Sequence, residues 1–188
     1  MEAEDDLRAA LKRVAVTLKG ADVPFALAGG YAGWARGGPE PDHDVDFVLP
    51  QEHLEKAAEA LRNAGVRIEE PPEDWLIKAY CGEELVDLIH TPAGRPVTAD
   101  LIERADMLDV DSVEMPVIAA TDLVAMKLRA MTEHYCDYSG VLPVARALRE
   151  QVDWSVLREE AEKSPFAGAF LLLADRLGIV PGDDRPAG

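Results

Sequence analysis

The chain has 188 residues and a formal net charge of −17, and 48% of its residues are hydrophobic. This length suits one domain, or one domain with a small appendage, and the composition excludes a disordered chain. The acidic balance disfavours nonspecific contact with nucleic acid or anionic membranes, although a local basic site is still compatible with it. The two cysteines form no disulfide framework or zinc motif, and no apolar stretch approaches the roughly 20 residues of a membrane-spanning helix. We therefore expect a soluble, cytoplasmic protein with no membrane partner.

Strands and helices are mixed along the first 120 residues. Leu7, Leu11, Val14 and Leu18 share one face of an amphipathic helix predicted over 4–19. In chain order we then expect a buried strand over 23–29, a short helix over 31–36, a strand over 45–49, a helix over 51–64 and strands over 66–70, 75–81 and 84–90. A loop over 91–100 and weaker strands over 106–110 and 113–118 complete this part.

Helices account for most of the remaining chain. Thr121 suits the N-cap of a helix over 122–133, and Asp153 and Ser164, which is followed by Pro165, suit the caps of later helices. This order predicts an α/β fold, a mixed sheet flanked by helices, with a helical C-terminal part. We divide it into an α/β core over 1–120, a helical region packed on it over 121–180 and a mobile tail over 181–188.

Two aspartates begin the strand predicted over 45–49. Because side chains two apart in a strand point to the same face, Asp44 and Asp46 project together beside a loop. Two carboxylates this close repel each other, and a divalent cation removes that repulsion. Their hard oxygen atoms suit Mg²⁺ or Mn²⁺, so the pair predicts a metal site.

A third aspartate interrupts another apolar strand. Asp87 lies between Val86 and Leu88, where a charge is costly without a partner. If its strand lies beside the first, Asp87 joins Asp44 and Asp46. Three carboxylates can hold two metal ions in the arrangement that serves in-line phosphoryl transfer.

Gly29 and Gly30 follow the first predicted strand, at the point where a short helix begins. Glycine permits unusual backbone angles and a close approach of a ligand, and amides at the start of a helix attract anions. A triphosphate could lie between these glycines and the metal site.

The whole pattern resembles the DNA polymerase β-like nucleotidyltransferase superfamily. It consists of Ala28-Gly29-Gly30, thirteen further residues, Asp44-Val45-Asp46-Phe47 and the later Asp87.

A second resemblance lies further along the chain. Residues 115–131 and 134–148 resemble the second half of the AbiEii/MenT-type nucleotidyltransferases, where a helical lysine and a downstream aspartate complete the site. Here these residues are Lys127 and Asp137. The resemblance implies transfer of NMP from an NTP, ATP among them, to an acceptor hydroxyl, with release of pyrophosphate.

The resemblance also implies roles for individual residues. Asp44 and Asp46 would bind the metal ions, and Asp87 would be a third ligand or the base that activates the acceptor. Lys127, with the two glycines, would bind the triphosphate, and Asp137 would orient Lys127 or the acceptor. AbiEii/MenT proteins are toxins of toxin–antitoxin pairs, and several modify the 3′ end of tRNA. We therefore expect an RNA acceptor, tRNA in particular, and an antitoxin partner. An acidic protein must gather cations locally to hold RNA, and the candidates are Arg36, Lys78, Arg95, Lys127 and Arg129.

Three alternatives remain. A small cationic acceptor would suit the net charge, and the Gly-Gly-Tyr-Ala opening also resembles aminoglycoside and lincosamide nucleotidyltransferases. In those enzymes a histidine precedes the aspartate pair nearby. Here His43 directly precedes Asp44, but an extra aspartate, Asp42, lies before the histidine. A nucleotide-binding module without catalysis would act through partner contacts, but all three carboxylates are present. A glycosyltransferase with an Asp-x-Asp metal site would need neither the glycines nor Asp87.

Overall fold

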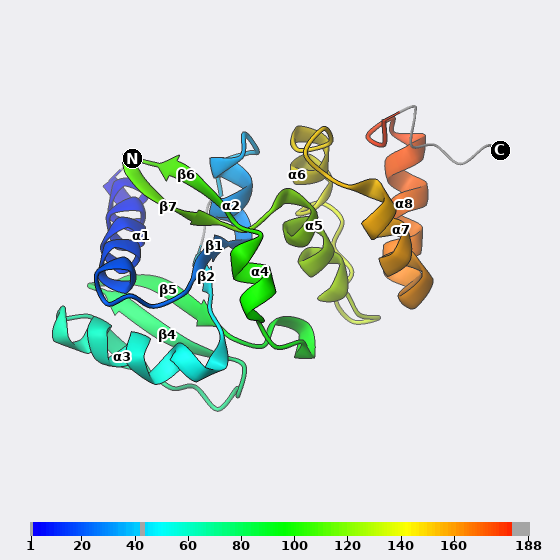
Figure 1. Cartoon of the computed structure of the whole chain (residues 1–188). Helices are drawn as coiled ribbons and strands as arrows, with labels where there is room; N and C mark the ends of the chain where they lie inside the picture. The colour runs from blue at the N-terminus through cyan, green and yellow to red at the C-terminus, as the bar shows by residue number, and fades with distance from the viewer. Residues whose placement is uncertain (1, 42–43, 182–188) are drawn as a thin grey trace.

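A computed structural model describes residues 2–41 and 44–181, and Asp42, His43 and the tail from residue 182 lie outside this part of the chain. The described residues form a seven-stranded sheet in the order β3-β4-β5-β2-β1-β7-β6 (Figure 1). The strands are β1 (Ala26–Ala28), β2 (Val45–Val48), β3 (Arg67–Glu69), β4 (Leu76–Cys81), β5 (Glu84–Ile89), β6 (Asp106–Val110) and β7 (Val113–Val117). The sheet mixes parallel and antiparallel pairs, as the sequence predicts.

The middle of the sheet determines where the polar side chains meet. β2 pairs with β1 in antiparallel fashion and with β5 in parallel fashion, and β1 pairs with β7 in parallel fashion. The hairpins β3–β4, β4–β5 and β6–β7 extend the sheet on both sides. β2 and β5 are therefore neighbours although two strands separate them in the sequence.

Two helices cover one face of the sheet. The helices are α1 (Glu2–Gly20), α2 (Gly29–Ala35), α3 (Leu54–Asn63), α4 (Ala99–Glu103), α5 (Ala120–Arg129), α6 (Leu142–Ala147), α7 (Trp154–Lys163) and α8 (Pro165–Arg176), with short 3₁₀ turns η1 (Gln51–His53) and η2 (Pro92–Gly94). Helices α1 and α3 contact each other against the sheet (Figure 1). The predicted apolar stripe of α1 is buried at Leu7, Leu11, Val14 and Leu18, and burying apolar area of this kind is the main favourable contribution to folding.

The helical C-terminal part stands beside the sheet. Figure 1 shows α5, α6, α7 and α8 on the side away from α1. α5 connects the two parts, because it contacts α2 as well as α7 and α8. Trp154 and Phe170 are among the largest fully buried side chains of these helices. None of the described helices is both long enough and apolar enough to cross a membrane.

Two local expectations were wrong. Thr121 does not cap α5, whose N-cap is Ala119; its hydroxyl instead accepts a hydrogen bond of 2.8 Å from the amide of Asp153. The segment 91–100, expected to be a loop, contains η2 and the start of α4, whose N-cap Thr98 accepts from the Leu101 amide. In the first case a tertiary contact uses the polar group that local rules assign to a helix cap.

Arg36 is a structural residue. It follows α2, its side chain is only 6% exposed, and it forms an ion pair of 2.7 Å with Asp106. Its guanidinium also donates to the carbonyl oxygens of Val117 (3.0 Å) and Ile118 (2.8 Å). These bonds join α2 to the β6–β7 hairpin, so Arg36 is removed from the cations available to a ligand.

Candidate active site

Charged side chains form a row across the sheet. The row starts at Ala28 on β1 and continues through charged residues at paired positions: Asp46 on β2, Asp87 on β5, Lys78 on β4 and Glu69 on β3. Paired residues of neighbouring strands project from the same face of a sheet. The two aspartates expected to meet are therefore adjacent, and a lysine follows them on the next strand.

Gly29 is required by the position of Asp46. Its backbone has a φ of +59°, and a β-carbon at this position would overlap Asp46 Oδ2. At Gly30 a β-carbon would lie 2.6 Å from the Cβ of Pro41, which is closer than van der Waals contact allows. The first glycine makes room for the carboxylate, and the second makes room for the loop that leads back to β2.

Burial and mutual repulsion disfavour the ionised forms of both aspartates. Burial raises the pKa of Asp46 to about 7, with further contributions from the charges of Asp87 and Asp44, while Lys127 acts in the opposite direction. Burial also raises the pKa of Asp87, and Lys78 opposes this rise. Asp44 lies just before β2 with a φ of +46°. At this end of β2 the nearby lysines therefore do not fully offset the burial and repulsion of the carboxylates.

The donor set fits a divalent cation. Among the described residues, Asp87 Oδ1 is buried and has no hydrogen-bond partner. Such an atom is costly unless something else satisfies it. Hard carboxylate oxygens that repel one another are typical ligands of Mg²⁺ or Mn²⁺. Within 2–41 and 44–181, no three acidic, histidine or cysteine side chains are gathered closely enough to hold a metal as they stand. Asp46 and Asp87, with Asp44 beside them, are the residues that could do so.

A large pocket opens over Asp46. It has a volume of about 920 Å³, and Gly29, Asp46 and Lys127 line it together. Lys127 is in the last turn of α5, so the helical part supplies a cation to a pocket whose floor belongs to the sheet. Much of the remaining wall is apolar and includes Trp75, Ile89, Leu123 and Met126. Such a pocket offers apolar surface for an organic ligand and charged groups at one end.

Asp137 lies elsewhere. It is exposed in the segment between α5 and α6, and its carboxylate accepts a hydrogen bond of 2.8 Å from the amide of Ser139. Hydrogen bonds from Ser139 lower its pKa. It does not line the pocket that contains Asp46 and Lys127. The structure thus brings Gly29, Asp46 and Lys127 to one pocket and Asp87 to the side of Asp46, and it leaves Asp137 outside.

Two residues of the candidate active site were not predicted from the sequence. Lys78 was considered only as a possible RNA contact, although it opposes Asp87 directly. A lysine between the buried residues Ile77 and Ala79 was the available signal, because it interrupts an apolar strand as Asp87 does. Trp75 is 41% exposed at the wall of the pocket, and no periodic pattern singles it out.

A mixed sheet with two neighbouring aspartates, a glycine turn against one of them and a lysine lining the same pocket is the arrangement expected of a nucleotidyltransferase. The comparison with protein families agrees: residues 2–179 match a family described as uncharacterised nucleotidyltransferase, and the chain belongs to it. This confirms the predicted membership of the polymerase β-like superfamily and makes the protein a nucleotidyltransferase enzyme. No curated protein sequence matches the chain.

Solved structures share the fold. The antibiotic-resistance factor ANT(2″)-Ia, in complex with adenylyl-2″-tobramycin, is 15% identical, with a TM-score of 0.62 over 87% of this chain and 98% of that one. The lincomycin-bound lincosamide antibiotic adenylyltransferase LnuA is 14% identical, with a TM-score of 0.51 over 75% of this chain and 93% of that one. An antigenic nucleotidyltransferase-like protein from Paracoccidioides brasiliensis is 14% identical, with a TM-score of 0.53 over 75% and 76%. At these identities the likeness concerns the fold.

Proposed function

We propose that the protein transfers NMP from an NTP to an acceptor hydroxyl with the help of a divalent metal ion. The observation that carries this proposal is the register of β2 and β5, which places Asp46 beside Asp87. Gly29 lies against Asp46, and Lys127 shares the pocket. A carboxylate, a glycine and a lysine in one pocket, with a second carboxylate beside the first, together suit a metal–triphosphate substrate.

The site residues have different roles in the proposed reaction. Asp44, Asp46 and Asp87 would hold Mg²⁺ or Mn²⁺, and the ion would supply positive charge that offsets the charge of the triphosphate. Lys127, which lines the same pocket as Asp46, would neutralise phosphate charge. The acceptor oxygen forms a bond to the α-phosphorus, the bond from that phosphorus to the bridging oxygen breaks, and pyrophosphate leaves. The hydroxyl proton passes to Asp87 if this residue acts as the base, and otherwise to solvent.

Two acceptor classes follow from different observations. The sequence resemblance favours the 3′ end of an RNA, and with it a toxin role and an antitoxin partner. The apolar wall around Trp75 and the net charge of −17 favour a small molecule, the class on which the structurally similar resistance enzymes act. Both use the same reaction site, so one assay compares them.

The test is a labelling assay with Mg²⁺ and each α-labelled NTP in turn. Total cellular RNA is the acceptor in one set of reactions, and a panel of aminoglycosides and lincosamides is the acceptor in the other. Asp46→Asn and Asp87→Asn should lower transfer at least about 100-fold, the scale of losing a group used in the transition state. The matched control is Glu69→Gln, which changes a carboxylate in the same row at the edge of the sheet and should leave transfer unchanged.

The outcome identifies the acceptor or removes the proposal. Label on a tRNA-sized band supports the RNA acceptor, and growth arrest on expression in a bacterial host, absent for Asp46→Asn, would support the toxin role. Label on a small molecule supports the resistance-type reaction. Transfer that survives both aspartate substitutions would overturn the assignment of the site.

A further inference from the structure

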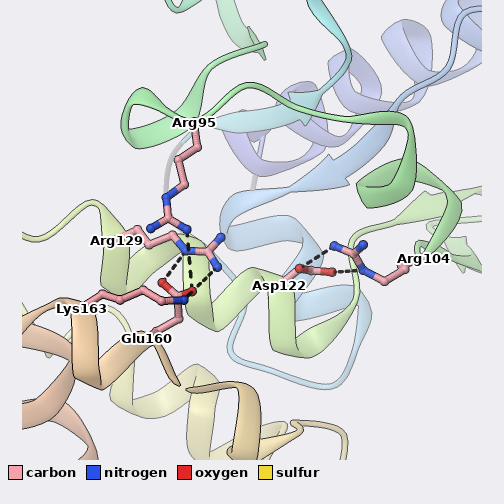
Figure 2. A network of polar contacts seen from close by, with 6 residues as sticks. All are labelled: Arg95, Arg104, Asp122, Arg129, Glu160 and Lys163. Atoms are coloured by element: carbon pink, nitrogen blue, oxygen red, sulfur yellow. Dashed lines mark hydrogen bonds and ion pairs between the residues drawn. The ribbon is translucent and has the colours of Figure 1, made fainter. Parts of the chain in front are cut away.

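A second charged cluster lies where the helical part meets the segment after β5. Glu160 on α7 is only 5% exposed, and Arg129 on α5 donates to its two oxygens at 2.8 and 2.7 Å. Lys163 and Arg95 approach the same carboxylate at 3.4 and 3.7 Å. Figure 2 shows these cations converging from three segments. We call Arg95, Arg129, Glu160 and Lys163 the Glu160 cluster.

The Glu160 cluster has more positive charge than Glu160 can balance. Three cations face one carboxylate, and the bidentate bond from Arg129 already uses both of its oxygens. The side chains of Arg95 and Lys163 are 52% and 55% exposed, so both cations stay accessible to a ligand. A local excess of cations in a chain with a net charge of −17 costs mutual repulsion unless an anion offsets it.

The Glu160 cluster borders the reaction pocket. A smaller hollow of about 170 Å³ lies between the segment after η2 and α5, and Arg95, Arg104 and Arg129 line it. Pro92, Ala93, Met126 and Arg129 line both this hollow and the pocket that contains Asp46. A ligand could therefore place one group over Asp46 and another among the arginines.

Not every arginine of the hollow is available. Arg104 donates twice to Asp122 at 3.1 Å, as Figure 2 shows, and Asp100 adds a further negative charge near it. Arg129 is likewise held by its two bonds to Glu160, so the cations most accessible to a ligand are Arg95 and Lys163.

We propose that the Glu160 cluster binds a phosphate group of the acceptor, so that the acceptor is a phosphate-bearing molecule and not a polycation. This proposal rests on the proposed function, because it concerns the acceptor of the proposed transfer reaction. Guanidinium groups match the geometry of phosphate oxygens and form strong charge-assisted hydrogen bonds with them. The phosphate can belong to an RNA backbone or to a phosphorylated small molecule, and the two share this chemistry.

Binding is measured without metal or NTP, so that the result does not depend on catalysis. The probe is a fluorescently labelled, 5′-phosphorylated RNA tetramer, followed by anisotropy at several salt concentrations. Arg95→Ala and Lys163→Ala should each weaken binding about threefold and together about tenfold. Each lost phosphate contact should reduce the slope of log K against log salt by about 0.7. The matched control is Arg67→Ala, an exposed arginine of the edge strand β3, which should leave binding unchanged.

Competition separates the two sources of phosphate. A nucleoside monophosphate that displaces the tetramer from wild type, and less well from Arg95→Ala, indicates a small phosphorylated acceptor. Displacement only by longer RNA indicates a nucleic-acid acceptor. Both results support the proposal. Equal tetramer binding by wild type and the double variant overturns it, as does an aminoglycoside bound without any effect of Arg95→Ala.

Further measurements distinguish this proposal from the proposed function. Asp46→Asn should bind the tetramer normally, because Asp46 is not part of the Glu160 cluster. Arg95→Ala should leave the affinity for Mg²⁺-NTP unchanged, and an equal loss for NTP and tetramer would assign the cluster to the nucleotide and overturn the proposal. If transfer is absent but the tetramer result holds, only the proposed function fails.

Discussion

The carboxylate of Asp46 lies directly against the α-carbon of Gly29, so that any side chain at residue 29 would overlap Asp46 Oδ2. The turn that follows β1 therefore packs closely against the Asp46 side chain of β2. This contact holds Asp46 beside Asp87 on the next strand, and it explains why the glycine turn and the aspartate pair belong to one site.

Gly29→Ala should remove activity and destabilise the protein, whereas Gly82→Ala should only destabilise it slightly. Both glycines have a positive φ, +59° and +69°, but no atom of the described residues lies within 4 Å of a β-carbon at Gly82. The strain of this backbone conformation costs about 1 kcal/mol in each case, and only at residue 29 must Asp46 also move. Urea unfolding and NTP turnover of the two variants check this, and equal effects on both would contradict the role of the contact.

Asp46→Asn should stabilise the metal-free protein at pH 8. The folded state raises the pKa of Asp46 from 3.8 to about 7, so the stability linked to its proton is fully present below pH 3.8 and is lost as the pH rises through about 7. Above that pH an ionised Asp46 is buried near other carboxylates, and asparagine removes this repulsion. We expect a gain of at least about 1 kcal/mol at pH 8 and little change at pH 4, measured by urea unfolding in EDTA. A loss of stability at pH 8 would contradict the repulsion.

Lys127→Ala should raise the KM for NTP and lower kcat/KM by roughly 10- to 100-fold, because a cation facing the triphosphate is lost. The control is Lys56→Ala, which changes a lysine on α3 that donates to the Asp22 carbonyl.

Asp137→Asn tests the orienting role predicted from the sequence. Its position outside the pocket leads us to expect less than about a twofold change in kcat/KM, and a larger loss would restore that role. Steady-state kinetics with several NTP concentrations gives all three results.

Glu160→Gln should destabilise the protein at neutral pH and lose this effect in acid. The Arg129 guanidinium holds the pKa of Glu160 at about 2, below its ordinary 4.5. The ionised Glu160 carboxylate therefore contributes roughly 3 kcal/mol to the free energy of unfolding. This contribution is present above pH 4.5 and is lost as the pH falls towards 2. Urea unfolding of both proteins at pH 7, 4 and 3 measures the difference, and a difference independent of pH would show that Glu160 contributes through packing alone.

Arg36→Ala should cost about 2–4 kcal/mol of stability, because it leaves the carbonyl oxygens of the buried residues Val117 and Ile118 without their guanidinium donor. Arg149→Ala is the control, since Arg149 is exposed and, in the part of the chain that the structure describes, forms its ion pair with the adjacent Glu150. Thermal and urea unfolding of both variants provide the comparison. A cost within about 0.5 kcal/mol of the control would mean that solvent replaces these bonds.

The sequence by itself determined the local features. The apolar period of α1, the alternation in β2, the glycine turn and the cap at Ser164 depend on residues a few positions apart, which backbone geometry places in a fixed relation. The superfamily resemblance follows from such spacing. The shared face expected for Asp44 and Asp46 stays a prediction, because Asp44 lies before β2 with a φ of +46°. The mixed sheet and the helical end followed from the order of these elements.

Only the tertiary structure decided which distant residues meet. That β5 lies between β4 and β2, with Lys78 opposite Asp87, depends on strand pairing that local periodicity leaves open. Arg36 is buried and Thr121 holds Asp153 because other segments cover them. The Glu160 cluster joins three segments that are far apart in the sequence. Such neighbours are set by the burial of apolar surface over the whole chain, a sum that no short stretch of sequence contains.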